Sequence, residues 1–212
     1  MFHNKKILFI GAHYDDLELG CGGTMLKYQK SSEIHYLIAT DSEIKRNKKI
    51  IRSKDLIKKD VSKIKKKLNL TSLRNLNFKC NTLQFNEKLI IKILDNIETI
   101  KPDVIFTHWP EDIHQDHSAI GKATMSAGRH IKNILFYQSN FYDSLNKFKE
   151  NFYINITKEF SEKIDLIKIF KNELKRNSNS WIDQVEKSNS LYGYKIQTKY
   201  AEAFQILRLA NY

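Results

Sequence analysis

The fold is decided by the stretch at residues 6–24, which reads KILFIGAHYDDLELGCGGT. Its apolar run from Ile7 to Ile10 is typical of a strand buried on both faces, as in a parallel sheet covered by helices. Directly after this run comes the polar cluster His13-Tyr14-Asp15-Asp16, and then glycines that we expect to form a tight turn and to allow close helix–strand packing. The stretch therefore predicts a buried strand, a loop rich in imidazole and carboxylate groups, and a helix.

The same order of strand and helix continues along the chain. Apolar periodicity and stop signals such as Lys101-Pro102-Asp103 define the expected segments. We expect strands at 6–11, 34–40, 73–78, 104–107, 133–138 and 152–157, and helices at 24–30, 49–68, 86–100, 117–131, 159–175 and 180–190. This alternation predicts an α/β fold, Rossmann-like, with a mostly parallel sheet and helices on both faces. With two prolines, seven glycines and no linker, residues 1–212 are expected to form a single domain.

A second polar cluster, His114-Gln115-Asp116-His117, follows the predicted strand at 104–107 after a short loop. Ligands of open parallel sheets bind beyond the carboxyl ends of the strands, so both clusters are expected at one edge of the sheet. Histidine and carboxylate groups are the ligands that hold a divalent metal such as zinc. The two clusters together favour a metal-dependent hydrolase.

The positive charge is concentrated in one segment. The net charge is +12, and residues 45–67 hold twelve Lys and Arg but only two acids. Apolar residues recur there at helical spacing, so an amphipathic helix with outward lysines is the favoured interpretation; they are Ile57, Val61, Ile64 and Leu68. A nucleic-acid-binding module is a distant alternative, because no aromatic residues interleave with the lysines. Attraction of an anionic substrate, such as a nucleotide-linked sugar, stays open.

The cysteines and the hydropathy indicate a cytoplasmic protein. Cys21 and Cys80 are the only cysteines, which is too few for a disulfide framework in a chain of 212 residues. The longest apolar runs are far too short to span a membrane, and the N-terminal residues lack the pattern of a signal peptide. We therefore expect a cytoplasmic location, no membrane span and no nucleic-acid partner, with a homo-oligomer left open.

Four motifs resemble those of one known family. Residues 12–24, AHYDDLELGCGGT, resemble the signature A-H-P-D-D-x-E-x-G-C-G-G-T of the LmbE/PIG-L deacetylases. Residues 114–117, HQDH, resemble its H-x-D-H, and residues 200–204, YAEAF, match its Y-A-E-x-F. Residues 52–55, RSKD, resemble its R-x-x-E. The motifs stand in family order and cover most of the chain, with the least signal in 140–195.

The resemblance implies a Rossmann-like hydrolase that removes acetyl groups from N-acetylglucosamine-type substrates, usually with zinc, although Fe²⁺ or another divalent ion would also suit these ligands. Three protein ligands and an open position are the arrangement of a catalytic zinc. The implied roles are metal ligands His13, Asp16 and His117; general base Asp15; oxyanion or leaving-group partner His114, oriented by Asp116; and substrate contacts Arg52, Asp112 and Tyr14, the last standing where the family has proline.

Other interpretations of the same residues stay open. The site suits an amidase acting on another small-molecule amide, such as a thiol conjugate, equally well. Arg52 lies in so basic a segment that one more surface charge is an alternative, and His108 is expected at the surface or against substrate. Cys21, between glycines, is expected to be a small packing residue rather than a nucleophile.

Overall fold

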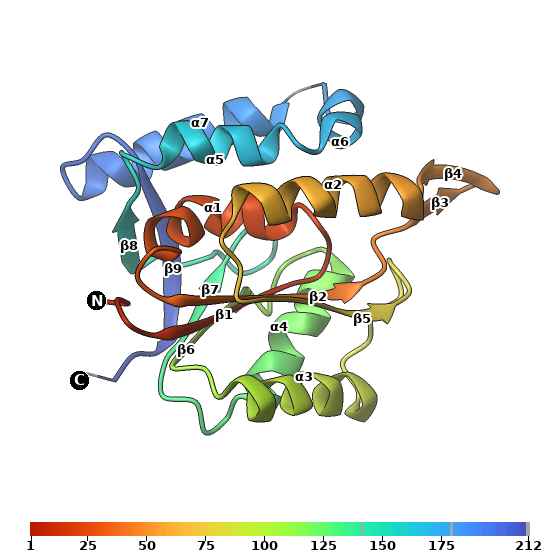
Figure 1. Ribbon diagram of the computed structural model, residues 1–212, viewed down its shortest axis with the longest axis horizontal. Coiled ribbons are helices and arrows are strands. Elements are labelled where there is room, and N and C mark those ends of the chain that lie inside the picture. Colours follow the sequence, from red (N-terminus) through yellow and green to blue (C-terminus); the bar gives the residue numbers. More distant parts are fainter. Residues whose placement is uncertain (141, 179, 211–212) are drawn as a thin grey trace.

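The computed structural model describes residues 1–140, 142–178 and 180–210. Its main sheet has the strand order β5-β2-β1-β6-β7-β9-β8 (Figure 1). Five neighbouring strands are parallel: β1 (Lys6–Gly11), β2 (Glu33–Thr40), β5 (Ser72–Phe78), β6 (Val104–His108) and β7 (Ile134–Tyr137). The last two, β9 (Ala201–Arg208) and β8 (Phe152–Asn155), are antiparallel to their neighbours. The predicted fold class, with its mostly parallel sheet, is confirmed.

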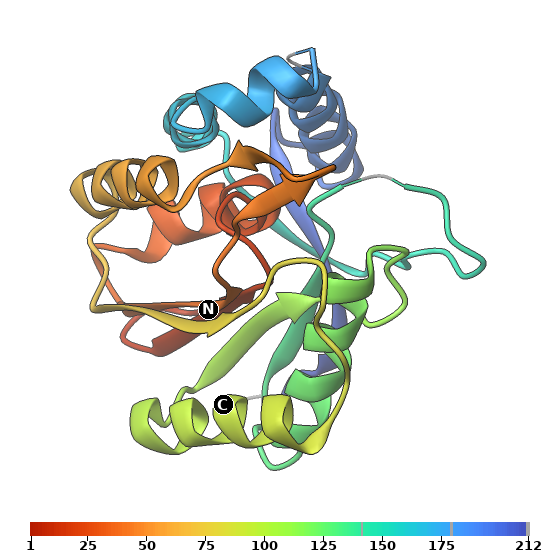
Figure 2. The ribbon, with the colours of Figure 1, turned by 90° about the vertical axis from the view of Figure 1, so that its right-hand side faces the viewer.

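Helices cover both faces of this sheet (Figures 1 and 2). One face carries α1 (Asp16–Tyr28), α2 (Lys54–Lys67), α5 (Phe160–Ile167), α6 (Lys171–Arg176) and α7 (Ser180–Lys195), and the other carries α3 (Glu87–Ile100) and α4 (Gln115–Ala127). Successive side chains of a strand point to opposite faces, so β1 contributes Ile7 and Phe9 to one core and Leu8 and Ile10 to the other. The all-apolar run of this strand is thereby explained.

The first helix begins earlier than predicted, at Asp16 instead of residue 24, so the glycines lie inside α1 and form no turn. Their role is close packing, as expected. A Cβ added at Gly20 would lie 2.3 Å from Cδ2 of Tyr137, and one at Gly23 would lie 2.7 Å from Cδ1 of Ile156. The absence of side chains here lets α1 lie directly against β7 and the segment after β8.

The predicted helix at 49–68 was wrong in its first turn. Residues Lys49–Arg52 form β4, which pairs antiparallel with β3 (Ile44–Arg46) in a hairpin. Helix α2 begins only after Ser53, whose Oγ accepts a hydrogen bond from the N–H of Leu56 and so caps the helix. The predicted apolar face of this helix is confirmed, since Ile57 and Ile64 are buried.

The C-terminal third also differs from the prediction. The helix expected at 159–175 is two helices, α5 and α6, because Ile169 and Phe170 turn inward between them and are buried. Strand β9 was not predicted, although it pairs with both β7 and β8. None of the helices in the described part of the chain is both long and apolar enough to cross a membrane.

Candidate active site

A cavity lies beyond the carboxyl ends of β1, β6 and β7, where sequence reasoning expected the two clusters to meet. Both clusters reach it: the first through the loop after β1 and the start of α1, the second through the start of α4. Its wall is formed by His13, Asp15, Asp16, Leu19, Ser42, Ile44, Arg52, Cys80, Asn81, His114, His117, Ser139, Asn140, Tyr142, Arg176 and Trp181.

The three predicted metal ligands lie together in this cavity. One carboxylate oxygen of Asp16, Oδ2, is 3.3 Å from Nδ1 of His13. The other, Oδ1, is 3.2 Å from Nε2 of His117. His13, Asp16 and His117 are all buried. Two imidazole nitrogens therefore face a single carboxylate across a short gap, which is a suitable donor set for a divalent cation.

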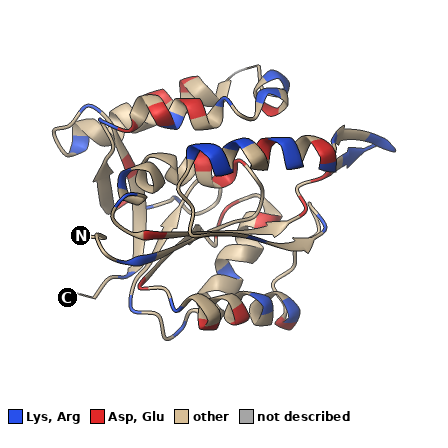
Figure 3. Cartoon of the chain, in the orientation of Figure 1, with Lys and Arg blue, Asp and Glu red and all other residues tan. Residues whose placement is uncertain are grey.

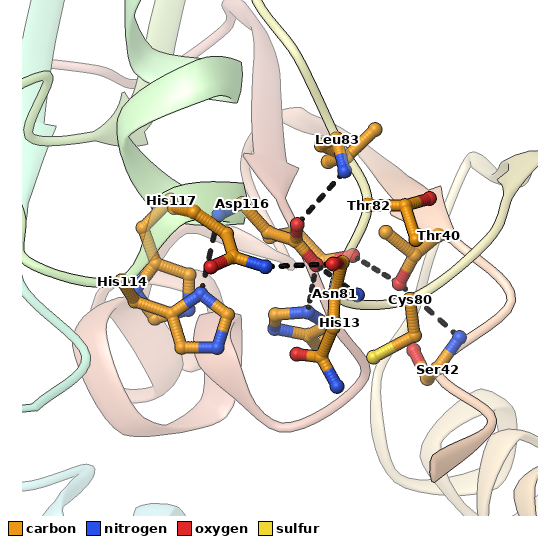
Figure 4. Close-up of polar contacts among 12 residues, drawn as sticks. His13, Thr40, Ser42, Cys80, Asn81, Thr82, Leu83, His114, Asp116 and His117 are labelled. Carbon is orange, nitrogen blue, oxygen red and sulfur yellow. Dashed lines mark hydrogen bonds and ion pairs between the residues drawn. The ribbon is translucent and has the colours of Figure 1, made fainter. Parts of the chain in front are cut away.

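The remaining nitrogen of each of these imidazoles is held by a second carboxylate. Nε2 of His13 lies 2.9 Å from Oδ2 of Asp116, and Nδ1 of His117 lies 3.1 Å from Oδ2 of Asp112 (Figure 4 shows the first pair). Metal-bound histidines almost always have such a partner, which fixes the ring and directs its free nitrogen to the ion. The residues present therefore fit a metal ion.

This arrangement changes two predicted roles. Asp116 was expected to orient His114, but its carboxylate contacts His13 and accepts hydrogen bonds from the backbone N–H groups of Asn81 (2.7 Å) and Leu83 (3.0 Å). Asp112 was expected to contact substrate, but it lies behind His117 and outside the cavity wall. Both carboxylates thus lie against histidines, because the N–H groups of the 79–83 loop hold Asp116 and the N–H of His114 holds Oδ1 of Asp112 (2.8 Å).

His108 is a residue that sequence reasoning placed wrongly. It has no exposed surface, and its Nε2 lies 3.1 Å from Oδ2 of Asp16 and 3.2 Å from the N–H of Ala12. Its ring stacks on that of His117 with 4.0 Å between the centroids. Burial, together with the nearby His117, lowers the pKa of His108 to about 4, so it is neutral. Its position directly after the predicted buried strand at 104–107 was the sequence signal for this location.

The carboxylates around His13 and His117 raise the pKa values of both histidines. Burial alone lowers the pKa of His13, but hydrogen bonds to Asp116 and Asp16 outweigh it and raise this pKa well above its usual range. Burial likewise opposes the charge of His117, but Asp16 and Asp112 raise its pKa to about 9. These histidines hold protons because carboxylates surround them, and a bound divalent cation would take the place of those protons.

Asp15 faces the same cavity from a strained backbone conformation. It precedes α1 with φ 131° and ψ −30°, a region that residues other than glycine rarely occupy and that is typical of functional sites. Burial raises the pKa of Asp15 to about 7, although the guanidinium of Arg52 opposes this shift. A carboxylate with a pKa near neutrality suits a general base.

Arg52 is buried and is no surface charge. Its Nη1 lies 2.9 Å from Oδ2 of Asp15, and its Nη2 donates to the backbone oxygen of Tyr14 (2.8 Å). Arg52 therefore fixes the loop that carries Asp15, at the wall of the cavity.

Tyr14 lies elsewhere than predicted. Its ring stacks near Tyr36 with 6.2 Å between centroids, and its hydroxyl accepts a hydrogen bond from Asn75, outside the cavity wall. Its backbone N–H donates to Oγ of Ser42 (3.0 Å), a bond that the usual proline cannot make. Tyr14 thus holds the loop by a backbone hydrogen bond, where the ring of a proline would fix φ. The expected contact of Tyr14 with substrate was wrong, because its side chain lies outside the cavity wall.

His114 caps α4 and lines the cavity. Its Nδ1 accepts a hydrogen bond from the backbone N–H of Asp116 (3.2 Å), and its ring stacks on His117. Burial, with the neighbouring His117, lowers the pKa of His114 to about 4, so the imidazole is neutral. Because Nδ1 accepts, the single proton lies on Nε2, which makes that nitrogen a donor.

Comparisons with known proteins identify the family of this chain. Residues 8–128 match the model of the PIG-L family, GlcNAc-PI de-N-acetylase. The uncharacterized deacetylase YaiS of Escherichia coli (strain K12) is 33% identical over 142 residues, which cover 64% of this chain and 74% of YaiS.

Two solved structures share the fold. N,N'-diacetylchitobiose deacetylase from Pyrococcus horikoshii superposes with a TM-score of 0.83 at 20% identity, covering 96% of this chain and 84% of that one. GalB, the 4-carboxy-2-hydroxymuconate hydratase of Pseudomonas putida KT2440, gives 0.78 at 13% identity, covering 98% and 99%. At these identities the likeness shows the fold alone. The family match covers more than half of the chain and includes both histidine–carboxylate clusters, so the chain belongs to the PIG-L family of deacetylases.

Proposed function

We propose that this protein is a metal-dependent hydrolase that removes the acetyl group from an N-acetylated amino sugar or its conjugate. The observation that carries the proposal is the pair of histidines, His13 and His117, that face Asp16 and are each backed by a further carboxylate. These three residues would hold Zn²⁺, with Fe²⁺ as an alternative. When bound, such a metal acts as a Lewis acid and lowers the pKa of water, which generates a nucleophile at neutral pH.

The residues around the metal ligands have complementary tasks in the reaction. Asp15 accepts a proton from the attacking water, since its pKa is about 7 and Arg52 holds only its Oδ2. Nε2–H of His114 donates a hydrogen bond to the acetamide oxygen as negative charge develops there. Asp15 then returns its proton to the leaving nitrogen, the C–N bond breaks, and acetate and the free amine leave.

The acceptor part of the substrate would contact the outer wall of the cavity. Trp181 and Arg176 come from α7 and α6, Ile44 begins β3, and Tyr142 lies on the segment between β7 and β8. An aromatic ring and a guanidinium in one cavity wall suit a sugar that carries a polar or anionic substituent. These side chains lie largely outside the shared motifs, so they are the candidates for substrate specificity.

The test is acetate release by the purified, zinc-loaded enzyme from a panel of N-acetyl amino sugars, with one amide of a thiol conjugate included. Asp15→Asn is expected to lower kcat by about 10²–10⁴-fold, because a general base contributes about that much, while bound zinc stays unchanged. Asp165→Asn, at an exposed carboxylate on α5, is the matched control. Turnover of Asp15→Asn within ten-fold of wild type would contradict the assigned role, and turnover of the thiol conjugate alone would replace the sugar as substrate.

A further inference from the structure

The β3–β4 hairpin stands away from the rest of the molecule beside the cavity. Figure 1 shows it projecting beyond the N-terminal end of α2. All residues from 45 to 51 are exposed, and they include two isoleucines, Ile50 with 59% and Ile51 with 40% of its surface accessible. A two-stranded hairpin without a covered face is only marginally stable in water. Exposed isoleucines at such a position indicate a surface that another apolar phase covers.

Most of the positive charges of the hairpin are also uncompensated. Residues 45–51 carry four cations and no acid. Lys45 pairs with Glu43 at 2.8 Å, whereas Arg46, Lys48 and Lys49 have no ion pair or hydrogen bond to any side chain in the described ranges. The lysines of α2 differ, since acids neutralise several of them in the pairs Lys58–Asp55, Lys63–Asp60 and Lys67–Asp165. Figure 3 shows the basic hairpin next to the mixed charges of α2.

We propose that this hairpin docks the protein on an anionic lipid surface. The cations of the hairpin meet the headgroup charges, and Ile50 and Ile51 enter the boundary with the acyl chains. A nucleic acid fits less well, because a phosphate backbone offers no apolar phase for isoleucines and the hairpin has no aromatic residue for base stacking. Its basal residues Ile44 and Arg52 line the cavity, so the docked protein holds its active site next to the lipid surface.

The test is sedimentation of the full chain with vesicles, without substrate, so that it is independent of the enzymatic activity. Wild type is expected to bind phosphatidylcholine vesicles that contain about a third phosphatidylglycerol and to leave pure phosphatidylcholine vesicles unbound. Lys48→Glu/Lys49→Glu should lower the partition coefficient at least about 25-fold, since each cation near an anionic surface contributes about five-fold. Ile50→Ser/Ile51→Ser should lower it at least about ten-fold and leave its salt dependence unchanged.

The matched control is Lys92→Glu/Lys122→Glu, which makes the same change of charge on α3 and α4, on the other face of the sheet. It is expected to bind vesicles as wild type does. The proposal is overturned if wild type ignores both kinds of vesicle, if the control loses as much binding as the hairpin variants, or if both hairpin variants bind normally. Hairpin-dependent binding of duplex DNA, or hairpin-dependent dimers in light scattering, without vesicle binding would likewise replace the lipid surface by another occupant.

Discussion

Replacing Lys163 by methionine is expected to destabilise the protein strongly. The Lys163 side chain has no exposed surface, and its Nζ donates to Oε1 of Glu202 (2.7 Å) and to Oδ1 of Asn189 (3.0 Å). Methionine keeps most of the volume but leaves the buried carboxylate of Glu202 without a cation. Removing one partner of a buried pair costs about 3–5 kcal/mol.

The lower end of that range applies here, because three donors to Glu202 remain: the N–H groups of Gly23 and Thr24, both at 2.8 Å, and the Thr24 hydroxyl at 2.6 Å. A loss of about 3 kcal/mol corresponds to a decrease in Tm of about 6–12 °C for a domain of this size. The measurement is urea and thermal unfolding followed by circular dichroism.

Two further variants sharpen this experiment. Lys163→Met/Glu202→Gln removes both charges and should recover part of the loss, because no uncompensated carboxylate is left. Lys168→Met removes an exposed lysine of the same segment, 4.0 Å from Asp165, and should change stability little. A loss below about 1 kcal/mol in Lys163→Met, or a double variant less stable than the two single variants combined, would show that the buried carboxylate of Glu202 does not depend on this cation.

Three other outcomes are expected. Gly20→Ala should lower the free energy of unfolding by about 1–3 kcal/mol, because the added Cβ would lie 2.3 Å from the ring of Tyr137. Gly22→Ala should lower it less, because its Cβ would lie 3.2 Å from the flexible side chain of Lys163. Equal losses of the two variants in urea unfolding would contradict this prediction. Burial raises the pKa of Glu18 from 4.5 to about 8, so the native state holds an extra proton between these values and stability falls as pH rises through them. The free energy of unfolding of Glu18→Gln, relative to that of wild type, should therefore increase as the pH is raised from 5 to 8. If the free energies of unfolding of the two proteins change with pH in parallel, this effect is excluded. Dialysis against a chelator should abolish acetate release and lower Tm, and added zinc should restore both; activity that survives in metal-free protein would refute metal dependence.

The sequence predicted where the two histidine–carboxylate clusters meet better than it predicted the contacts that support them. His13 lies in the loop after β1, and Asp16 and His117 lie in the first turns of α1 and α4, which follow β1 and β6, so their meeting point follows from the parallel sheet. The partner of Asp116 was predicted wrongly, because it is oriented by the backbone amides of Asn81 and Leu83. Every residue except proline has a backbone N–H, so hydrogen bonds from a loop's backbone cannot be predicted from a sequence motif.

The errors in the fold have similar physical reasons. Glycines disfavour helices by intrinsic propensity, so α1 was expected to start after them. In the structure the glycines lie inside α1, because Tyr137 and Ile156 pack so closely that a Cβ at Gly20 or Gly23 would clash with them. The lysine-rich run at 45–52 suits a helix as well as a strand by composition, and only the capping Ser53 marks the true start of α2. Strands with a continuous apolar run, such as β1 and β6, were predicted correctly because burial on both faces leaves one pattern.

The contact between Glu202 and α1 has a consequence for the order of events during translation. The donors on Gly23 and Thr24 emerge early from the ribosome, whereas their carboxylate acceptor follows 179 and 178 residues later. Strand β9, which carries Glu202, also has to insert between β7 and β8. Pairing over such sequence separations is slow because loop closure comes before the contact. The motif at residues 12–24 is therefore synthesised first, and Glu202 can anchor it only after residue 202 has been translated.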